Sequence, residues 1–191
     1  KQVQKNLFER NIQFIVHITH PIDGICTLAK NAALVVVDCG YLHVQKEWRK
    51  KVADQIDCPL IQVESDVIVP VETVSNKEEY AAYTLRPKIH RLLPKFLTEL
   101  TANTVKKGSL DYDFSSINLS HTSSITSQLD VDSSVSLVSS FTGGEDQAKK
   151  VLDQFIKHHI NRYDILRNDP SKTVTSQLSP YLHFGHISPL Y

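Results

Sequence analysis

A tyrosine, an arginine and several hydroxyl-bearing residues near the end of the chain have the types and spacing of an anion-binding site. Tyr163 and Arg167 are four residues apart in a helix-like segment, which puts both side chains on one helix face. Beyond an Asn-Asp-Pro stop, Thr175, Ser176 and Ser179 stand where a new helix is expected to begin. Hydroxyls and free backbone N–H groups at a helix start bind phosphates well. The pattern predicts a nucleotide-phosphate site, with plain helix capping as the simpler alternative.

One long helix is expected to carry Tyr163 and Arg167. It begins after two glycines and ends at the Asn-Asp-Pro stop, residues 168–170. Its apolar stripe consists of Ala148, Leu152, Phe155 and Ile156.

The first 73 residues alternate between strand-like and helix-like segments. Strands are expected within residues 12–18, 32–40 and 58–65, with helices between them. A continuous β-branched run such as 32–40 is typical of a parallel strand buried on both faces. We therefore predict an α/β fold, part of a doubly wound, Rossmann-like parallel sheet with helices on both faces.

The carboxyl edge of this predicted sheet offers only weak ligand candidates. The first 73 residues contain no glycine-rich phosphate motif, so the fold by itself identifies no ligand. Asp38, Gly40 and Glu64 follow the strands, and a structural role is favoured for each.

A further helix is expected after residue 75, capped by Ser75 or Asn76 and interrupted near Pro87. It carries a basic run, for which a solvated face is favoured over phosphate contact: Arg86, Lys88, His90, Arg91 and Lys95. Residues 101–142 are rich in Ser and Thr and are expected to form an extended linker over the surface, the least ordered part of the chain.

Composition excludes several classes of function. With 21 basic and 21 acidic residues the net charge is zero, so any contact with DNA must be local. Three scattered cysteines argue against a disulfide framework, and no segment resembles a membrane span or a signal peptide. No metal site is expected, because the paired histidines lack further ligands at suitable spacing. We expect an intracellular protein, cytoplasmic in a prokaryote or nuclear in a eukaryote.

The segments "NRYDILRNDP" and "TSQLSPYLHFGHISP" resemble the photolyase/cryptochrome family at the start of its FAD-binding helical domain. The segments "VVVDCGYLHVQKEWRKKVADQIDCPLIQVES" and "GGEDQAKKVLDQFI" are similar to class II cyclobutane pyrimidine dimer photolyases. The resemblance implies a C-terminal part of the α/β domain at 1–73, a helix and interdomain linker at 74–142, and the first helices of an all-α FAD-binding domain at 143–191. Tyr83, Ser133 and His186 depart from the residues expected in this class.

Carried over residue by residue, the resemblance implies that six residues bind FAD: Tyr163, Thr175, Ser176, Gln177, Leu178 and Ser179. It also implies that Arg167 lies near the substrate phosphates, and that an antenna chromophore of unknown identity occupies the α/β domain. The implied activity is light-driven repair of pyrimidine dimers in damaged DNA by electron transfer from reduced FAD, in a monomeric lyase. No catalytic side chain is expected within these residues.

Two alternatives remain open at this point: a cryptochrome-like flavin photoreceptor without repair activity, and a non-functional remnant. The sequence starts without methionine and stops soon after the predicted flavin segment begins. We therefore expect a fragment cut at both ends that by itself neither retains FAD nor repairs dimers.

Overall fold

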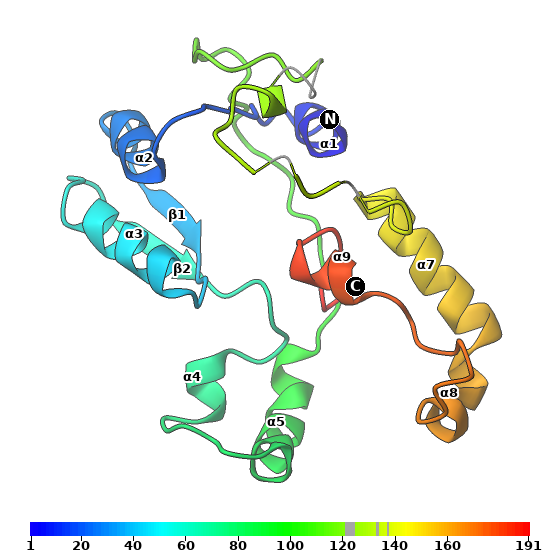
Figure 1. Ribbon diagram of the computed structural model, residues 1–191. Helices are drawn as coiled ribbons and strands as arrows, with labels where there is room; N and C mark the ends of the chain where they lie inside the picture. The colour runs from blue at the N-terminus through cyan, green and yellow to red at the C-terminus, as the bar shows by residue number, and fades with distance from the viewer. Residues whose placement is uncertain (121–124, 133, 137) are drawn as a thin grey trace.

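The computed structural model describes residues 1–120, 125–132, 134–136 and 138–191 (Figure 1). The main elements, in chain order, are α1 (Gln2–Phe8), α2 (Pro21–Ala29), β1 (Val35–Asp38), α3 (His43–Ala53), β2 (Leu60–Val63), α4 (Val71–Val74), α5 (Ala82–Phe96), α7 (Glu145–His158), α8 (Ile160–Leu166) and α9 (Ser179–His183).

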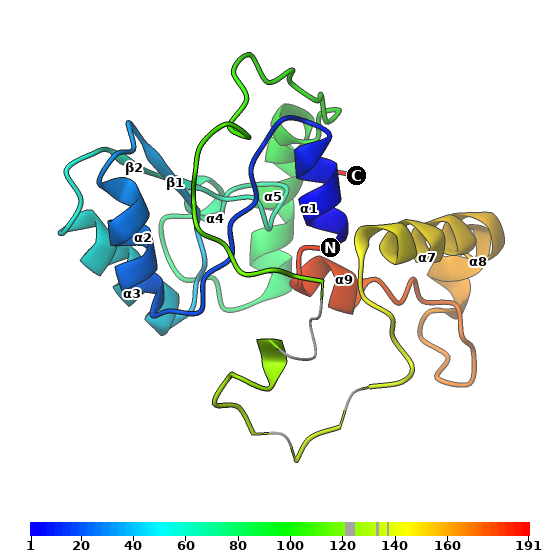
Figure 2. The ribbon, with the colours of Figure 1, turned by 90° about the horizontal axis from the view of Figure 1, so that it is seen from above.

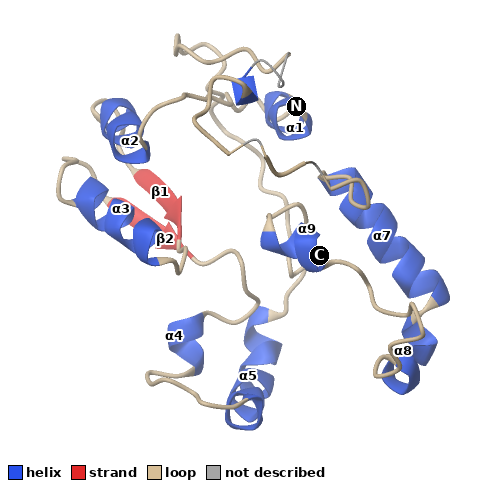
Figure 3. Cartoon of the chain, viewed as in Figure 1, coloured by secondary structure: helices blue, strands red, loops and turns tan. Residues whose placement is uncertain are grey.

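Two parallel strands form the sheet, and α3 connects them. β1 pairs with β2 in a register that runs from Val35 opposite Leu60 to Asp38 opposite Val63. α2 and α3 pack together beside the strands (Figure 3), where the rings of His20 and Trp48 meet edge to face at 6.0 Å. The predicted α/β class with parallel strands is thus confirmed.

One face of the sheet is not covered, contrary to the expectation of helices on both faces. Figure 2 shows α2 and α3 on the same side of the strands. On the other side, Val36, Ile61 and Val63 are 56%, 48% and 46% exposed. The described residues therefore supply one of the two helical layers that a parallel sheet requires.

The strand predicted at residues 12–18 is wrong. This segment is not paired with another strand among the described residues. Its backbone forms only isolated hydrogen bonds with the predicted linker, and these do not make the regular series that a sheet requires. Ile117 N–H donates to Val16 O at 3.0 Å, and Val16 N–H donates to Ser116 Oγ at 2.9 Å. Ser109 N–H likewise donates to Asn11 O at 2.9 Å.

The predicted linker at residues 101–142 is partly described, and its residues 125–126 are helical. Residues 101–120 contain neither helix nor strand and run along residues 11–17 over the surface. Residues 121–124, 133 and 137 of the predicted linker lie outside the described residues, Ser133 among them.

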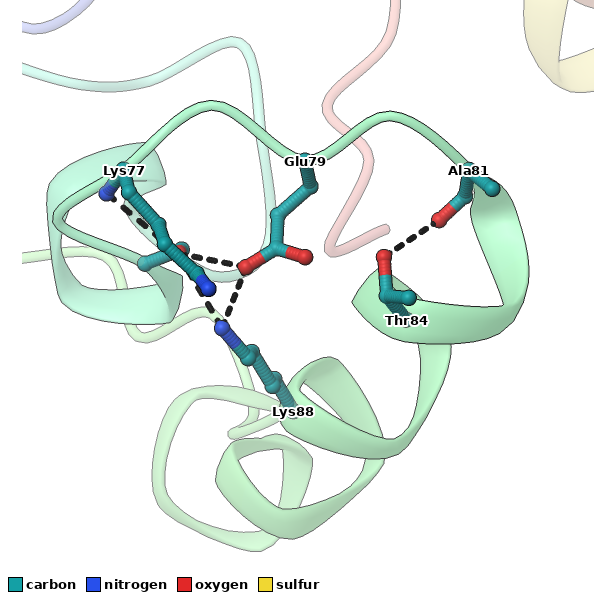
Figure 4. A network of polar contacts seen from close by, with 6 residues as sticks. Lys77, Glu79, Ala81, Thr84 and Lys88 are labelled. Atoms are coloured by element: carbon teal, nitrogen blue, oxygen red, sulfur yellow. Dashed lines mark hydrogen bonds and ion pairs between the residues drawn. The ribbon is translucent and has the colours of Figure 1, made fainter.

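α5 begins at Ala82, so the predicted caps at Ser75 and Asn76 are wrong. The reason is a local polar network (Figure 4): Ser75 Oγ donates to Glu79 Oε1 at 2.8 Å, and Lys88 of α5 pairs with the same carboxylate. This network holds the residues before α5 in a non-helical turn. The predicted interruption is also wrong, because the helix continues through Pro87.

The Glu79 network makes a prediction about acid stability. Hydrogen bonds from Lys88 and, after it, Ser75 lower the pKa of Glu79 from its ordinary 4.5 to about 2. A lowered carboxyl pKa contributes stability that is fully present above pH 4.5 and is lost as the pH falls from there to about 2. In Glu79→Gln we expect a lower free energy of unfolding at neutral pH, with the deficit shrinking across that window. Urea titrations at several pH values measure it.

The neighbouring exposed carboxylate, Glu78, provides the control. Glu78→Gln should leave the pH dependence of unfolding unchanged. Equal behaviour of the two variants would contradict the role assigned to Glu79.

The chain is open, with an exposed surface of 15,303 Å² at a mass of 21.6 kDa. A compact monomer of this mass exposes only about 9,000 Å². None of the described helices is both long and apolar enough to cross a membrane.

Candidate functional site

α7 and α8 place Tyr163 and Arg167 against each other, as the helical spacing predicted. The Arg167 guanidinium lies 5.8 Å from the centre of the Tyr163 ring, and Arg167 N–H donates to Tyr163 O at 2.9 Å. The half-buried Tyr163 ring is itself held edge to face by Phe155 of α7 at 5.5 Å. The helix differs from the single one predicted, since it breaks at His159. This break lets the ring of Tyr163 fold back on Phe155.

The turn after α8 leads into the hydroxyl-rich segment. Asp169 accepts hydrogen bonds from Ser171 Oγ at 2.7 Å and from Ser171 N–H at 2.9 Å. These bonds, the one from the side chain first, hold the pKa of Asp169 below its usual range. These bonds stabilise the ionised carboxylate and hold it within its own turn.

Residues 175–179 form a tight turn that exposes hydroxyl groups. Gln177 has a φ of 57°, and its Nε2 donates to Thr175 Oγ1 at 2.7 Å. Leu178 N–H donates to Ser176 Oγ at 3.4 Å. Ser179 is exposed and begins α9, and its hydroxyl forms no hydrogen bond with any described residue. Thr175 and Ser176 act only as acceptors in these bonds, so their O–H protons stay free to donate.

The donor chemistry of this turn fits a phosphate group. Three hydroxyls can donate, and no carboxylate lies within residues 171–179 to repel an anion. α9 is only five residues long, so its dipole adds little and the side chains carry the fit.

The structure does not bring Tyr163 together with this turn. Figures 1 and 2 both show α8 beyond the end of α7 that lies away from α9. No hydrogen bond or ring contact joins Tyr163 or Arg167 to residues 175–179, all of which are described. Leu178 of the turn packs against a cluster that involves α7 as far as Leu152, whereas Tyr163 contacts Phe155 nearer the end of that helix.

Tyr181 and His186, which the sequence reasoning did not select as site residues, anchor the turn to α7. Tyr181 is buried with Ala148 and Ile187, and Leu178 packs against this cluster. Tyr181 Oη donates to Thr142 O at 3.0 Å, and His186 Nδ1 accepts from Gly144 N–H at 3.2 Å. The apolar stripe of α7 is the sequence feature that could have pointed to these residues, because its first two turns need apolar side chains to pack against them.

The hydroxyl of Tyr181 is expected to stabilise this anchor. Tyr181→Phe keeps the ring but leaves Thr142 O without its donor, which should lower the free energy of unfolding by about 0.5–1.5 kcal/mol. The control is Tyr191→Phe, because Tyr191 is 63% exposed and its hydroxyl has no partner among the described residues. Urea unfolding followed by circular dichroism compares them, and equal losses would contradict the anchoring role.

A second candidate site is a cavity of about 440 Å³ at the carboxyl edge of the sheet. Asp38 and Gly40 line it, together with apolar side chains from α2 and α3 that include Ile25 and Trp48. Glu64 does not line it, since its carboxylate accepts from Tyr41 Oη and, at 3.0 Å, from Val71 N–H at the start of α4. The carboxyl edge of the sheet therefore borders a cavity. Glu64 lies outside its lining and connects Tyr41 to the start of α4.

Comparisons with known proteins agree with these features. A family model described as DNA photolyase matches residues 1–106. The deoxyribodipyrimidine photo-lyase of Methanothermobacter thermautotrophicus is 42% identical over 191 residues, which is 100% of this chain and 42% of the relative. The enzyme of that name from Potorous tridactylus is 33% identical over 179 residues, 89% of this chain and 30% of the relative.

A plant protein of the same name, from Oryza sativa, is 32% identical over 139 residues, which is 66% of this chain and 26% of the relative. The chain thus spans at most about two fifths of the length of these relatives. The family model covers the α/β part, and the Methanothermobacter match extends through residues 163–179. The chain belongs to the DNA photolyase family.

Proposed function

We propose that the complete protein, of which this chain spans about two fifths of a relative's length, repairs cyclobutane pyrimidine dimers in damaged DNA using light and FAD, and that the chain by itself does not. The observation that carries the proposal is the 42% identity along the entire chain with a protein named deoxyribodipyrimidine photo-lyase. The candidate residues Tyr163, Arg167 and 175–179 all fall within that match. A cryptochrome-like photoreceptor and a non-functional remnant are less favoured, because the relatives named above all carry the photo-lyase name.

FAD is the cofactor we propose, held at its phosphates by the turn at residues 175–179. When bound, FAD supplies the light-driven electron transfer. The exposed hydroxyls of Thr175 and Ser179 donate to phosphate oxygens, and Ser176, Gln177 and Leu178 shape the turn. Tyr163 is proposed to bind the same cofactor, but its ring, braced by Phe155, lies apart from this turn, so joint binding requires α8 to approach residues 175–179.

Arg167 is assigned to the damaged DNA strand. Its guanidinium is exposed and suits bidentate contact with a phosphate. The neighbouring Tyr163 ring restricts the side chain at 5.8 Å, which reduces the entropy lost on binding.

The cavity beside Trp48 is our candidate for the antenna chromophore. Its volume of about 440 Å³ suits a small aromatic molecule, and its walls combine apolar surface with a few polar groups. Strand carboxyl ends are the usual ligand edge of such sheets.

We further propose membership of class II and a division into three parts at residues 1–73, 74–142 and 143–191. The class proposal rests on the resemblance of the segments around residues 35–65 and 143–156. Phylogenetic placement of the complete coding sequence among photolyases of all classes tests it, with grouping outside class II as the contrary result.

Repair is tested by the recovery of ultraviolet-irradiated plasmid DNA. The complete protein, reconstituted with reduced FAD, should restore transformation efficiency under blue light and leave it unchanged in the dark, whereas residues 1–191 alone should neither retain FAD nor restore it. Tight flavin binding without any light-dependent recovery would instead support a photoreceptor, and the absence of both would support a remnant.

A further inference from the structure

α5 presents an exposed face that carries positive charge and no negative charge. Arg86, His90, Arg91 and Lys95 are exposed along one side of the helix, and we name these four residues the basic face of α5. The opposite side is apolar: Leu85, Ile89 and Leu93 line a groove with residues of α4. The helix is therefore fixed from behind, with its basic face directed outward.

Three charges of the basic face are unpaired. Among the described residues, Arg86, Arg91 and Lys95 form no ion pair. Lys88 is different, because its side chain turns toward Glu79 (Figure 4) and its charge is neutralised there. Residues 80–98 contain no Asp or Glu, although the chain as a whole is electrically neutral.

Neither solubility nor helix stability accounts for this arrangement. A surface that only maintains solubility usually mixes both signs of charge, as α3 does where Lys51 pairs with Glu47 at 2.6 Å. The helix dipole favours cations in the last turn, which explains Lys95 alone. Arg86 lies in the second turn of α5, near the positive end of the dipole, and the first turn has no acidic residue.

We propose that the basic face of α5 binds the phosphate backbone of duplex DNA, separately from the repair site. The nature of the partner rests on the proposed function, whose substrate is DNA. Arg86 and Lys95 are nine residues apart, which is about 14 Å along the helix axis. One DNA strand presents a phosphate about every 3.4 Å of its axis, so roughly four phosphates fall within this span. Nine residues also turn the helix by about 180°, so Arg86 and Lys95 border the outward half of α5, and the cations form a broad patch that faces the anions.

The test is the salt dependence of binding to undamaged duplex DNA, measured on the whole protein. The variant Arg86→Gln/Arg91→Gln/Lys95→Gln should bind about tenfold or more weakly near 0.1 M salt. Its plot of log affinity against log salt concentration should be shallower by up to about 2.7, since each lost phosphate contact removes about 0.9. The matched control, Lys46→Gln/Lys50→Gln/Lys51→Gln, removes three charges from α3 and should leave the slope unchanged.

Further measurements separate this proposal from the repair function and from misfolding. Repair of an isolated dimer-containing dinucleotide, which is too small to reach α5 and the repair site together, should be equal in the wild type and the α5 variant. If the wild type failed to repair the dinucleotide while the salt slopes of the wild type and the α5 variant still differed, the repair function would be rejected and the α5 surface supported. Equal slopes in the α5 variant and wild type, or equal changes in both triple variants, would overturn the α5 proposal.

Hydrogen exchange on the wild-type protein gives an independent reading that needs no variant. Duplex DNA should protect the amides of residues 86–95 and leave those of α3 unchanged. No protection in α5 at saturating DNA would overturn the proposal.

Discussion

Replacing Thr175 with valine and Ser179 with alanine together is expected to weaken FAD binding by about a hundredfold to ten-thousandfold. Each hydroxyl would lose one hydrogen bond to a charged phosphate oxygen, worth about 1.5–3 kcal/mol. Both side chains are exposed, so the fold should be little affected. Titration of the complete apoprotein with FAD, followed by flavin fluorescence, measures the change.

Thr173→Val is the matched control, because it makes the same chemical change at an exposed position two residues earlier. It should bind FAD like the wild type. If the double variant also bound FAD normally, residues 175–179 would not hold the phosphates and the cofactor assignment would be wrong.

The second large effect is expected at Arg167. Arg167→Ala should lower the affinity for dimer-containing DNA by about tenfold to a hundredfold, because a charge-assisted contact with phosphate is lost. The FAD content should stay unchanged. Replacing Tyr163 with alanine should do the reverse and release the cofactor first. Flavin absorbance and DNA binding at one fixed salt concentration give the two readings.

Arg162→Ala is the control that removes one positive charge without removing the proposed contact with phosphate. Arg162 is exposed on the same helix, five residues before Arg167 and therefore on a different face. Its loss should change DNA affinity much less. An Arg167→Ala protein that lost FAD while binding damaged DNA normally would contradict the division of roles between Arg167 and Tyr163.

The parts of the fold that the sequence predicted correctly depend on local patterns. The β-branched run around Val35 and the run around Leu60 both form strands, and the helix expected after the two glycines begins directly after Gly144. In these segments, propensity and the period of the apolar residues agree, and tertiary contacts reinforce them.

The failures depend on distant residues. The segment at 12–18 has the composition of a strand, yet its backbone partners come from Ser109, Ser116 and Ile117 and do not form a ladder. Ser75 has the side chain of a helix cap, but Glu79 and Lys88 engage it in a different network. Local sequence patterns do not indicate which of several distant residues will become the hydrogen-bond partner.

The candidate site shows the same limit. Residue types and helical spacing correctly paired Tyr163 with Arg167, because only one turn separates them. The position of residues 175–179 relative to Tyr163 depends on the break at His159 and on the burial of Tyr181 against α7, and both are tertiary features.

The most direct test of the central claim is chromatographic counting of thymine dimers in an oligonucleotide incubated with the complete protein, FAD-loaded and reduced. Dimers should convert to intact thymines under blue light, many per flavin, and remain constant in the dark. Unchanged dimer content after prolonged illumination, with FAD bound and reduced and the oligonucleotide bound, would contradict the assignment of light-driven DNA repair.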